Sequence, residues 1–170
     1  MTSLNITTQT VILLFATLLT GLSAGLLFTW TNVITPGIGR LNDVNYLQAF
    51  QHMNRTILNP LFFIVFMGPV LLSFASTYVY RANPAYILWM LILASVIYFL
   101  GVFIVTFLGN IPLNEMLDKT NLADISLEDA WSLRNKFEIK WNNLHLIRTI
   151  SSTISFLLLI LTCLLRNDSI

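Results

Sequence analysis

The chain has 170 residues, of which 56% are hydrophobic and only 10% are charged, and its formal net charge is +1. Together with a mean hydropathy of +0.76, this composition excludes an ordinary soluble domain. The near-zero net charge also provides no basic surface for nucleic acid, so we expect an integral membrane protein without a nucleic-acid partner.

Uncharged apolar segments recur along the chain. A membrane-spanning helix needs about 20 mostly apolar residues, and four segments meet this requirement, at residues 9–31, 57–80, 86–108 and 145–165. The first has no Lys or Arg ahead of it and exceeds the apolar region of a secretory signal, so we expect it to be retained. The sequence predicts an all-α fold, with residues 1–170 forming one four-helix membrane domain surrounded by lipid.

The first span contains Gly21 and Gly25, a spacing of small residues that lets two helices approach closely. This spacing serves packing within the bundle or the association of two copies of the chain. An oligomer through the Gly21 and Gly25 face is therefore one expectation.

The connections between the spans differ in length. Arg81–Ala85 joins the second and third spans as a tight turn, whereas residues 32–56 and 109–144 form long connections that emerge together on the other side. We expect these two connections to form a cap and to carry function, because functional residues concentrate in such segments. Lys and Arg are more frequent on this side, so the positive-inside rule predicts that it is cytoplasmic.

Proline, glycine and capping residues predict where helices begin and end. Pro36–Gly39 is expected to break the first helix, Asn59–Pro60 to kink an amphipathic helix as it enters the second span, and Asn110–Asn114 to end the third. Ser126 starts a capping box, which predicts a last helix over residues 127–165. At 1.5 Å per residue that helix is nearly 60 Å long, so its first third must protrude from the membrane.

One face of this last helix carries side chains with functional chemistry. Six residues spaced three or four apart fall on a single face, since successive residues are rotated by about 100°. They are Trp131, Arg134, Glu138, Trp141, His145 and Arg148. An arginine in a span is costly in lipid, so we expect the face to meet protein or a cavity.

A structural explanation of the same face is also available. Trp131 and Trp141 would then be interfacial anchors, Arg134 and Glu138 an ion pair one helical turn apart, and Arg148 a side chain that reaches toward the membrane surface.

Further polar side chains flank the second and third spans near the same membrane face. They are His52, Asn54, Asn59, Asn110 and Asn114. Buried amides must be hydrogen-bonded, either to helix ends or to a ligand. We expect this group to converge with the face of the last helix.

Three segments, Gln51–Pro60, Asn110–Asn114 and Trp141–Thr149, resemble the blocks of the anthrone oxygenase-like family in order and spacing. The resemblance implies a small four-helix membrane protein, from a family known largely as a domain of unknown function. A minority of members look like monooxygenases that act on anthrone intermediates with dioxygen and no evident organic cofactor. Carried over by position, the resemblance implies functional roles for Asn54, Asn59, Asn110, Asn114, Trp141, His145 and Arg148.

Oxygenation without a cofactor requires a base that deprotonates an apolar phenolic substrate, so that the resulting anion can donate an electron to dioxygen. A base that titrates near neutral pH favours histidine, with His145 the first candidate and His52 the second. Arg148, assisted by Arg134, would stabilise the developing oxyanion. The predicted substrate-binding residues are Asn54, Asn59, Asn110, Asn114, Arg134, Trp131, Trp141 and Glu138.

Two other functions remain open. His52 and His145, with Glu115 or Glu138, would supply two imidazoles and a carboxylate for iron, although no His-x-x-x-His or Glu-x-x-His spacing supports a metal site. Alternatively, the protein binds a lipid or quinone without catalysis, or serves as an accessory membrane subunit. A cavity beside Arg148 with room for a planar ring would favour an enzyme, and a closed interior would favour a structural role.

Overall fold

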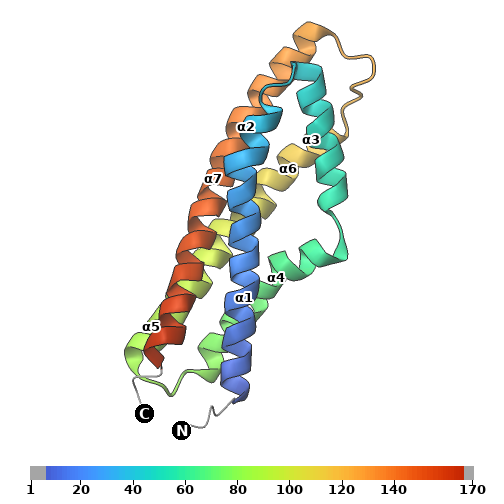
Figure 1. The fold of residues 1–170 in the computed structure, drawn as a ribbon. Coiled ribbons are helices and arrows are strands. Elements are labelled where there is room, and N and C mark those ends of the chain that lie inside the picture. Colours follow the sequence, from blue (N-terminus) through green and yellow to red (C-terminus); the bar gives the residue numbers. More distant parts are fainter. Residues whose placement is uncertain (1–6, 167–170) are drawn as a thin grey trace.

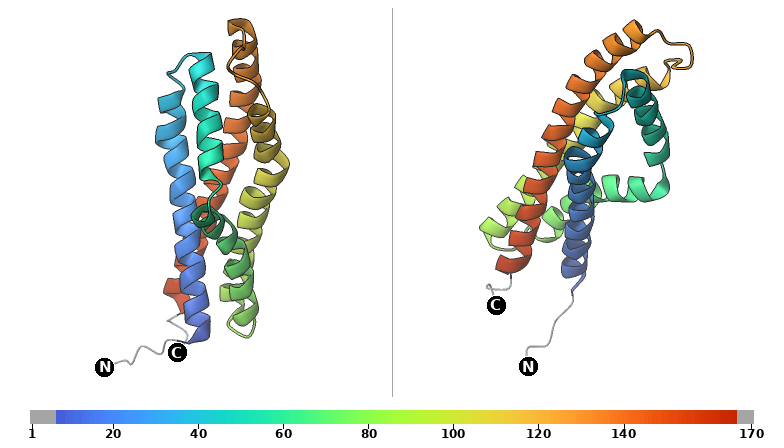
Figure 2. Two further views of the ribbon diagram at one scale, coloured as in Figure 1. Left: turned by 90° about the vertical axis from the view of Figure 1, so that its right-hand side faces the viewer. Right: turned by 45° about the horizontal axis from the view of Figure 1, so that its top comes forward.

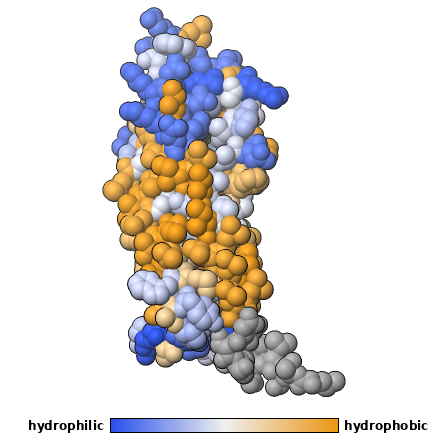
Figure 3. All heavy atoms as spheres, turned by 90° about the vertical axis from the view of Figure 1, so that its left-hand side faces the viewer, coloured by the Kyte–Doolittle hydropathy of each residue, from blue (hydrophilic) through white to orange (hydrophobic). Residues whose placement is uncertain are grey.

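The computed structural model describes residues 7–166, which form an elongated bundle of helices (Figure 1). Four helices are long and apolar enough to cross a membrane, namely Thr8–Ile38, Pro60–Val79, Ala85–Asp118 and Leu127–Leu165. On the face shown in Figure 3, an apolar band separates two more hydrophilic ends. The predicted all-α, four-helix membrane architecture is therefore confirmed.

The first long helix consists of α1 (Thr8–Thr29), a π-helical segment (Trp30–Ile34) and α2 (Thr35–Ile38). It ends at the predicted Pro36–Gly39 motif. Pro36 itself is tolerated because it lies in the first turn of α2, where its missing N–H is not needed.

Helices α3 (Asp43–Ile57) and α4 (Pro60–Val79) are separate, and not one kinked helix as predicted. Figure 2 shows that they meet at a sharp angle. Asn59 has an extended backbone with a ψ of 161°, which Pro60 favours in the residue before it, and its side chain caps α4. Pro69 lies inside α4, which bends along its length in Figure 1.

The third long helix runs from α5 (Ala85–Tyr98) through two π-helical segments (Phe99–Ile104 and Thr106–Asn110) into α6 (Ile111–Asp118). The predicted end at Asn110–Asn114 is therefore wrong. Pro112 lies in the first turn of α6, and the π-helical segment before it changes the hydrogen-bonding register, so the chain accommodates the missing donor without ending the helix.

Glycines let this third helix approach α7 (Leu127–Leu165). A Cβ atom at Gly109 would lie 2.8 Å from the Leu144 side chain, and one at Gly101 would overlap Ser151. On α1, a Cβ at Gly21 would lie 2.7 Å from Phe156 of α7, whereas Gly25 faces open space. Gly21 thus serves packing within the bundle, and association of two copies through this face stays a prediction.

The start of α7 is as predicted, because the Ser126 hydroxyl caps it by accepting a hydrogen bond of 3.1 Å from the Asp129 N–H. We call α3, α6 and residues 127–144 of α7 the cap. These elements gather at one end of the bundle, opposite the turn between α4 and α5 (Figure 1). Trp30, Phe50 and Trp141 belong to a hydrophobic cluster that joins the cap to the end of the first helix.

Candidate functional site

A cavity of about 310 Å³ lies where the end of α1, the α3–α4 junction, the third long helix and α7 meet. Ligand sites commonly measure about 300–1,000 Å³, so this cavity suits a small ligand. Most of its wall is apolar. The aromatic side chains that line it are Trp30, Phe62, Phe63, Phe66, Phe107 and Trp141.

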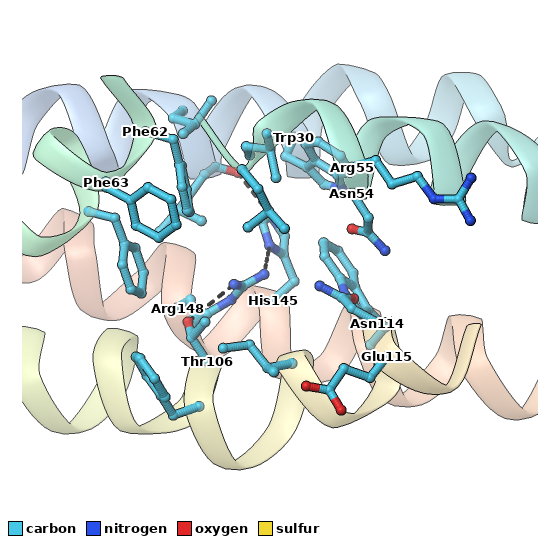
Figure 4. A pocket seen from close by; sticks show the side chains of 18 of the residues that line it. Trp30, Asn54, Arg55, Phe62, Phe63, Thr106, Asn114, Glu115, His145 and Arg148 are labelled. Carbon is cyan, nitrogen blue, oxygen red and sulfur yellow. Dashed lines mark hydrogen bonds between the residues drawn. The ribbon is translucent and has the colours of Figure 1, made fainter. Parts of the chain in front are cut away.

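Arg148 lies in the cavity wall and is only 7% exposed. Its Nη1 donates a hydrogen bond of 3.2 Å to the Thr106 hydroxyl, and its Nη2 donates one of 2.7 Å to Nδ1 of His145 (Figure 4). Its Nε has no hydrogen-bond partner. None of the ion pairs within residues 7–166 includes this guanidinium.

His145 is held on both sides of its ring. Nε2 lies 3.0 Å from the backbone carbonyl oxygen of Leu27, which can only accept, whereas the Arg148 guanidinium at Nδ1 can only donate. Nε2 therefore carries the hydrogen, and Nδ1 is the acceptor. Both nitrogens are occupied, so this arrangement offers no free acceptor for the base role that the sequence suggested.

The Leu27 carbonyl oxygen ends the hydrogen-bonded series that runs from Thr106 through Arg148 and His145. It also accepts from the hydroxyls of Thr31, at 3.2 Å, and Thr149, at 3.4 Å. The π-helical segment begins three residues later, at Trp30. Such wide turns interrupt the regular hydrogen-bond ladder and recur at functional sites.

Trp141 supports the histidine. Its indole stacks on the His145 ring with centroids 4.7 Å apart and planes 13° from parallel. Its Nε1 donates a 2.7 Å hydrogen bond to Oδ1 of Asn114, and its backbone oxygen accepts from Nδ2 of Asn110 at 3.3 Å. Asn114 lines the cavity, whereas Asn110 lies behind it, so both amides fix the position of Trp141.

The remaining two asparagines have different positions. Asn54 lines the cavity, and its Nδ2 is buried without a partner. Asn59 is exposed and lies outside the cavity lining. Its Oδ1 accepts from the Phe62 N–H at 3.0 Å, and its Nδ2 donates to the Thr56 carbonyl at 3.1 Å. Asn59 therefore has a helix-capping role, not the predicted place in a substrate site.

The outer half of the α7 face lies away from the cavity. Trp131 is 61% exposed, and neither Arg134 nor Glu138 lines the cavity. The Arg134 guanidinium instead links α7 to the turn between α2 and α3 through hydrogen bonds. Its partners are the carboxylates of Glu138 and Asp43, the backbone oxygens of Gly39 and Leu41, and the ring of Tyr46.

The charge of Arg134 is well compensated. Burial alone would lower the pKa of Arg134, but the hydrogen bonds and charges of Glu138 and Asp43 outweigh it and raise the pKa above its ordinary value. For Arg134 and Glu138 the structure thus favours the ion pair over the predicted substrate contacts, and Trp131 lies outside the cavity lining.

His52 also lies outside the cavity. It is exposed on α3, in a separate polar hollow that it shares with Gln51 and Thr120. Within residues 7–166 no three His, Cys, Asp or Glu side chains lie close enough together to hold a metal ion. The structure therefore does not assemble His52, His145 and a carboxylate of Glu115 or Glu138 into the iron site considered above.

Several residues of the cavity carried no sequence signal that singled them out. Thr106 is one of many hydroxyl side chains in apolar segments, and Trp30 has the pattern of an interfacial anchor. Phe62 and Phe66 stand four residues apart, and their rings stack at 5.3 Å. That spacing was the one available hint, but it is equally typical of ordinary helix packing.

Comparison with known families adds one finding. Residues 62–158, more than half of the chain, match the family model described as Anthrone oxygenase. The matched region contains Thr106, Trp141, His145 and Arg148, and it begins after Asn54. No curated protein and no solved structure matches the chain.

Proposed function

The chain belongs to the anthrone oxygenase family, and on this premise we propose that its cavity binds a planar phenolic substrate, which the protein oxygenates with dioxygen without an organic cofactor. The observation that carries the proposal is the cavity itself. It combines an aromatic, mostly apolar wall with a buried guanidinium, Arg148, beside the cap. A lipid-facing or purely structural helix requires neither feature.

The wall of the cavity suits a flat ring system. Phe62 and Phe66 present stacked rings from α4, and Phe107 continues a row of aromatic contacts on the third long helix. Figure 4 shows Phe62 and Phe63 on one side of Arg148 and His145, and Asn54 and Asn114 on the other. An aromatic ligand between these groups would place its oxygen atoms against the polar ones.

The proposed reaction needs no external reductant. A methylene group between two aromatic rings becomes a carbonyl, one oxygen atom of dioxygen enters that carbonyl, and the other leaves as water with the two methylene hydrogens. Loss of one methylene proton gives the enolate, which transfers one electron to dioxygen and then combines with the resulting superoxide at carbon. The peroxide anion formed takes up a proton to give a hydroperoxide. Loss of water from this hydroperoxide yields the ketone.

The substrate would enter from the membrane. Leu58, Phe63 and Phe107 line the cavity, yet they are 65%, 49% and 47% exposed, so they offer an apolar rim to the bilayer. We propose lateral entry past this rim, from the leaflet on the side of the cap. The excess of Lys and Arg there favours the cytoplasmic leaflet.

A non-catalytic function is the second candidate. The two hydrogen bonds of the His145 ring favour it, because they leave neither nitrogen of this histidine free to act as the base. The cavity would then hold a quinone or a lipid, or the protein would serve as an accessory subunit.

A measurement of oxygen uptake distinguishes the oxygenase from the non-catalytic function. Protein in lipid nanodiscs is mixed with a hydroxylated anthrone, and oxygen consumption and quinone absorbance are recorded against protein-free nanodiscs. We expect quinone and consumed oxygen in equal amounts, well above the uncatalysed rate.

The Arg148→Gln variant should lose this activity. The matched control is Arg166→Gln at the other end of the bundle, where Arg166 binds Thr10 and Tyr80. A rate equal to that of empty nanodiscs would contradict the enzyme proposal.

A further inference from the structure

We infer that the cavity binds its aromatic ligand as an oxyanion, a phenolate or an enolate, with Arg148 as the counter-ion and His145 as the positioning residue. This inference rests on the proposed function only in taking the cavity as the ligand site. It adds the charge state of the ligand and a different role for the histidine.

The charges around the cavity leave one positive charge uncompensated. The charged residues in its lining are Arg55, Glu115, Asp118 and Arg148. Arg55 pairs with Asp118 at 2.6 Å, and Glu115 pairs at 3.5 Å with Lys119, which lies outside the lining. Both carboxylates of the lining are therefore paired with other cations, and within residues 7–166 neither forms an ion pair with Arg148.

The groups that face Arg148 are neutral. Thr106 accepts its first hydrogen bond, and the neutral form of His145 accepts its second. The ring centroid of Trp141 lies 5.2 Å from the guanidinium carbon of Arg148. The hydroxyl of Tyr98, which interacts electrostatically with Arg148, is engaged with Ser23 at 2.7 Å and with the Phe66 carbonyl at 3.2 Å. A buried cation among neutral groups is unfavourable unless an anion joins it.

The alternative of a snorkelling arginine does not fit this geometry. A snorkelling side chain keeps its charged head in water. Arg148 is 7% exposed, its Nε is buried without a partner, and both ends of its guanidinium are tied to side chains inside the bundle. The structure holds the charge in place at the cavity wall.

His145 can orient the guanidinium of Arg148 without neutralising its charge. Its ring is fixed by the Leu27 carbonyl and by stacking on Trp141, so the Nδ1 lone pair is aimed at Arg148. A carboxylate in the same place would orient the guanidinium equally well but would neutralise it. A neutral acceptor leaves the whole positive charge for the ligand.

The other unmet polar atoms of the cavity wall point to the same ligand chemistry. Nε1 of Trp30 and Nδ2 of Asn54 are buried without partners, and both residues line the cavity. With Nε of Arg148, all three are hydrogen-bond donors. Because all three atoms are buried in the wall, a ligand with acceptor oxygens, one of them ionised, would reach and satisfy them only when these side chains turn toward it.

When the oxyanion is the enolate, whose formation removes a methylene proton, binding it also removes the need for a base. A phenol that partitions into the cavity would lose its proton to water at the mouth, because the guanidinium stabilises the ionised form. The pKa of the bound phenol should therefore fall by about 1–3 below its value in empty nanodiscs, as for an acid close to a fixed opposite charge.

The probe is 2-hydroxyanthraquinone, a planar phenol that cannot undergo the oxygenation and whose phenolate absorbs at longer wavelength. Its ionisation is titrated spectrophotometrically in nanodiscs with wild-type protein, with Arg148→Gln and with Arg166→Gln. We expect the lowered pKa in the wild type and in Arg166→Gln, and its loss in Arg148→Gln. A bound dye that titrates in the wild type as it does in empty nanodiscs would overturn the inference.

The histidine has its own test. His145→Leu removes the acceptor that aims the guanidinium, so the pKa of the bound dye should move back toward its value in empty nanodiscs. His145→Gln retains an acceptor oxygen and should restore part of the shift. An equal shift in both variants would refute the positioning role.

A second measurement avoids the variants altogether. Above the pKa of the dye, wild-type protein should bind 2-hydroxyanthraquinone about ten- to a hundredfold more tightly than its methyl ether, which cannot ionise. Equal affinities would overturn the inference.

If the dye ionises on binding but anthrones consume no oxygen, the proposed oxygenase function fails and this inference stands. If oxygen is consumed while the dye binds in neutral form, the oxygenase function stands and this inference fails.

Discussion

Two arginines on the same face of α7 have opposite environments. Arg134, in the cap, donates to two carboxylates and two backbone carbonyls. Arg148, at the cavity, contacts only neutral groups, and its Nε has no partner. A shared position on one helix face therefore does not give two arginines the same electrostatic environment, because that environment depends on the charges that other elements bring to each one.

The largest expected effect is on activity. Arg148→Gln removes the charge at the cavity but keeps a polar side chain of moderate size. If the guanidinium stabilises the oxyanion, kcat/KM for anthrone oxygenation should fall by about 10²–10³-fold. Oxygen electrode measurements in nanodiscs provide the value. A loss of less than threefold would place Arg148 with Arg134 as a structural residue.

Arg134→Met tests the other side of the comparison. It leaves Asp43 and Glu138 without their shared partner and frees the turn between α2 and α3. We expect a loss of about 2–3 kcal/mol in unfolding free energy, seen as a lower Tm in nanodiscs. Lys140→Met, on the exposed side of the same helix, is the control and should change little. An unchanged Tm for Arg134→Met would show that its contacts are dispensable.

Arg148→Met should have the opposite effect on stability. It removes two hydrogen bonds, but it also removes a buried charge that pairs with no carboxylate in the described part of the chain. The Tm of the ligand-free protein should stay the same or rise, by the equivalent of up to about 1 kcal/mol. Differential scanning fluorimetry without ligand measures it. A fall comparable to that of Arg134→Met would indicate that Arg148 already has a partner that balances it.

The smallest effect is expected for His52→Ala. The His52 side chain is exposed and lies outside the cavity, so oxygen uptake should remain within about twofold of the wild type. A large loss would reinstate the second histidine as a candidate base and contradict the arrangement of the cavity.

Local sequence patterns accounted for much of the fold. Apolar length located all four helices, and Ser126 located the start of α7, because both signals act within a few residues. The continuation of the third helix through Pro112 was not predictable, because it depends on a π-helical segment that no composition rule detects. The separation of α3 from α4 was also underestimated, although Asn59 before Pro60 favours such a break.

The candidate site could be predicted only in part. Periodicity placed Arg134 and Arg148 on one face, but it could not show that Asp43 would reach the first and that no carboxylate within residues 7–166 would pair with the second. The role of His145 depends on the Leu27 carbonyl, which belongs to a distant part of the chain. Residues that line the cavity from α4, such as Phe62, are indistinguishable in the sequence from ordinary apolar packing.

We infer that Arg148 holds an uncompensated charge for an anionic ligand. The most direct measurement is the pKa of 2-hydroxyanthraquinone bound to the wild type, to Arg148→Gln and to Arg166→Gln in identical nanodiscs. We expect a lowered pKa in the wild type and in Arg166→Gln, and no lowering in Arg148→Gln. A bound dye with the same pKa in all three proteins would contradict it.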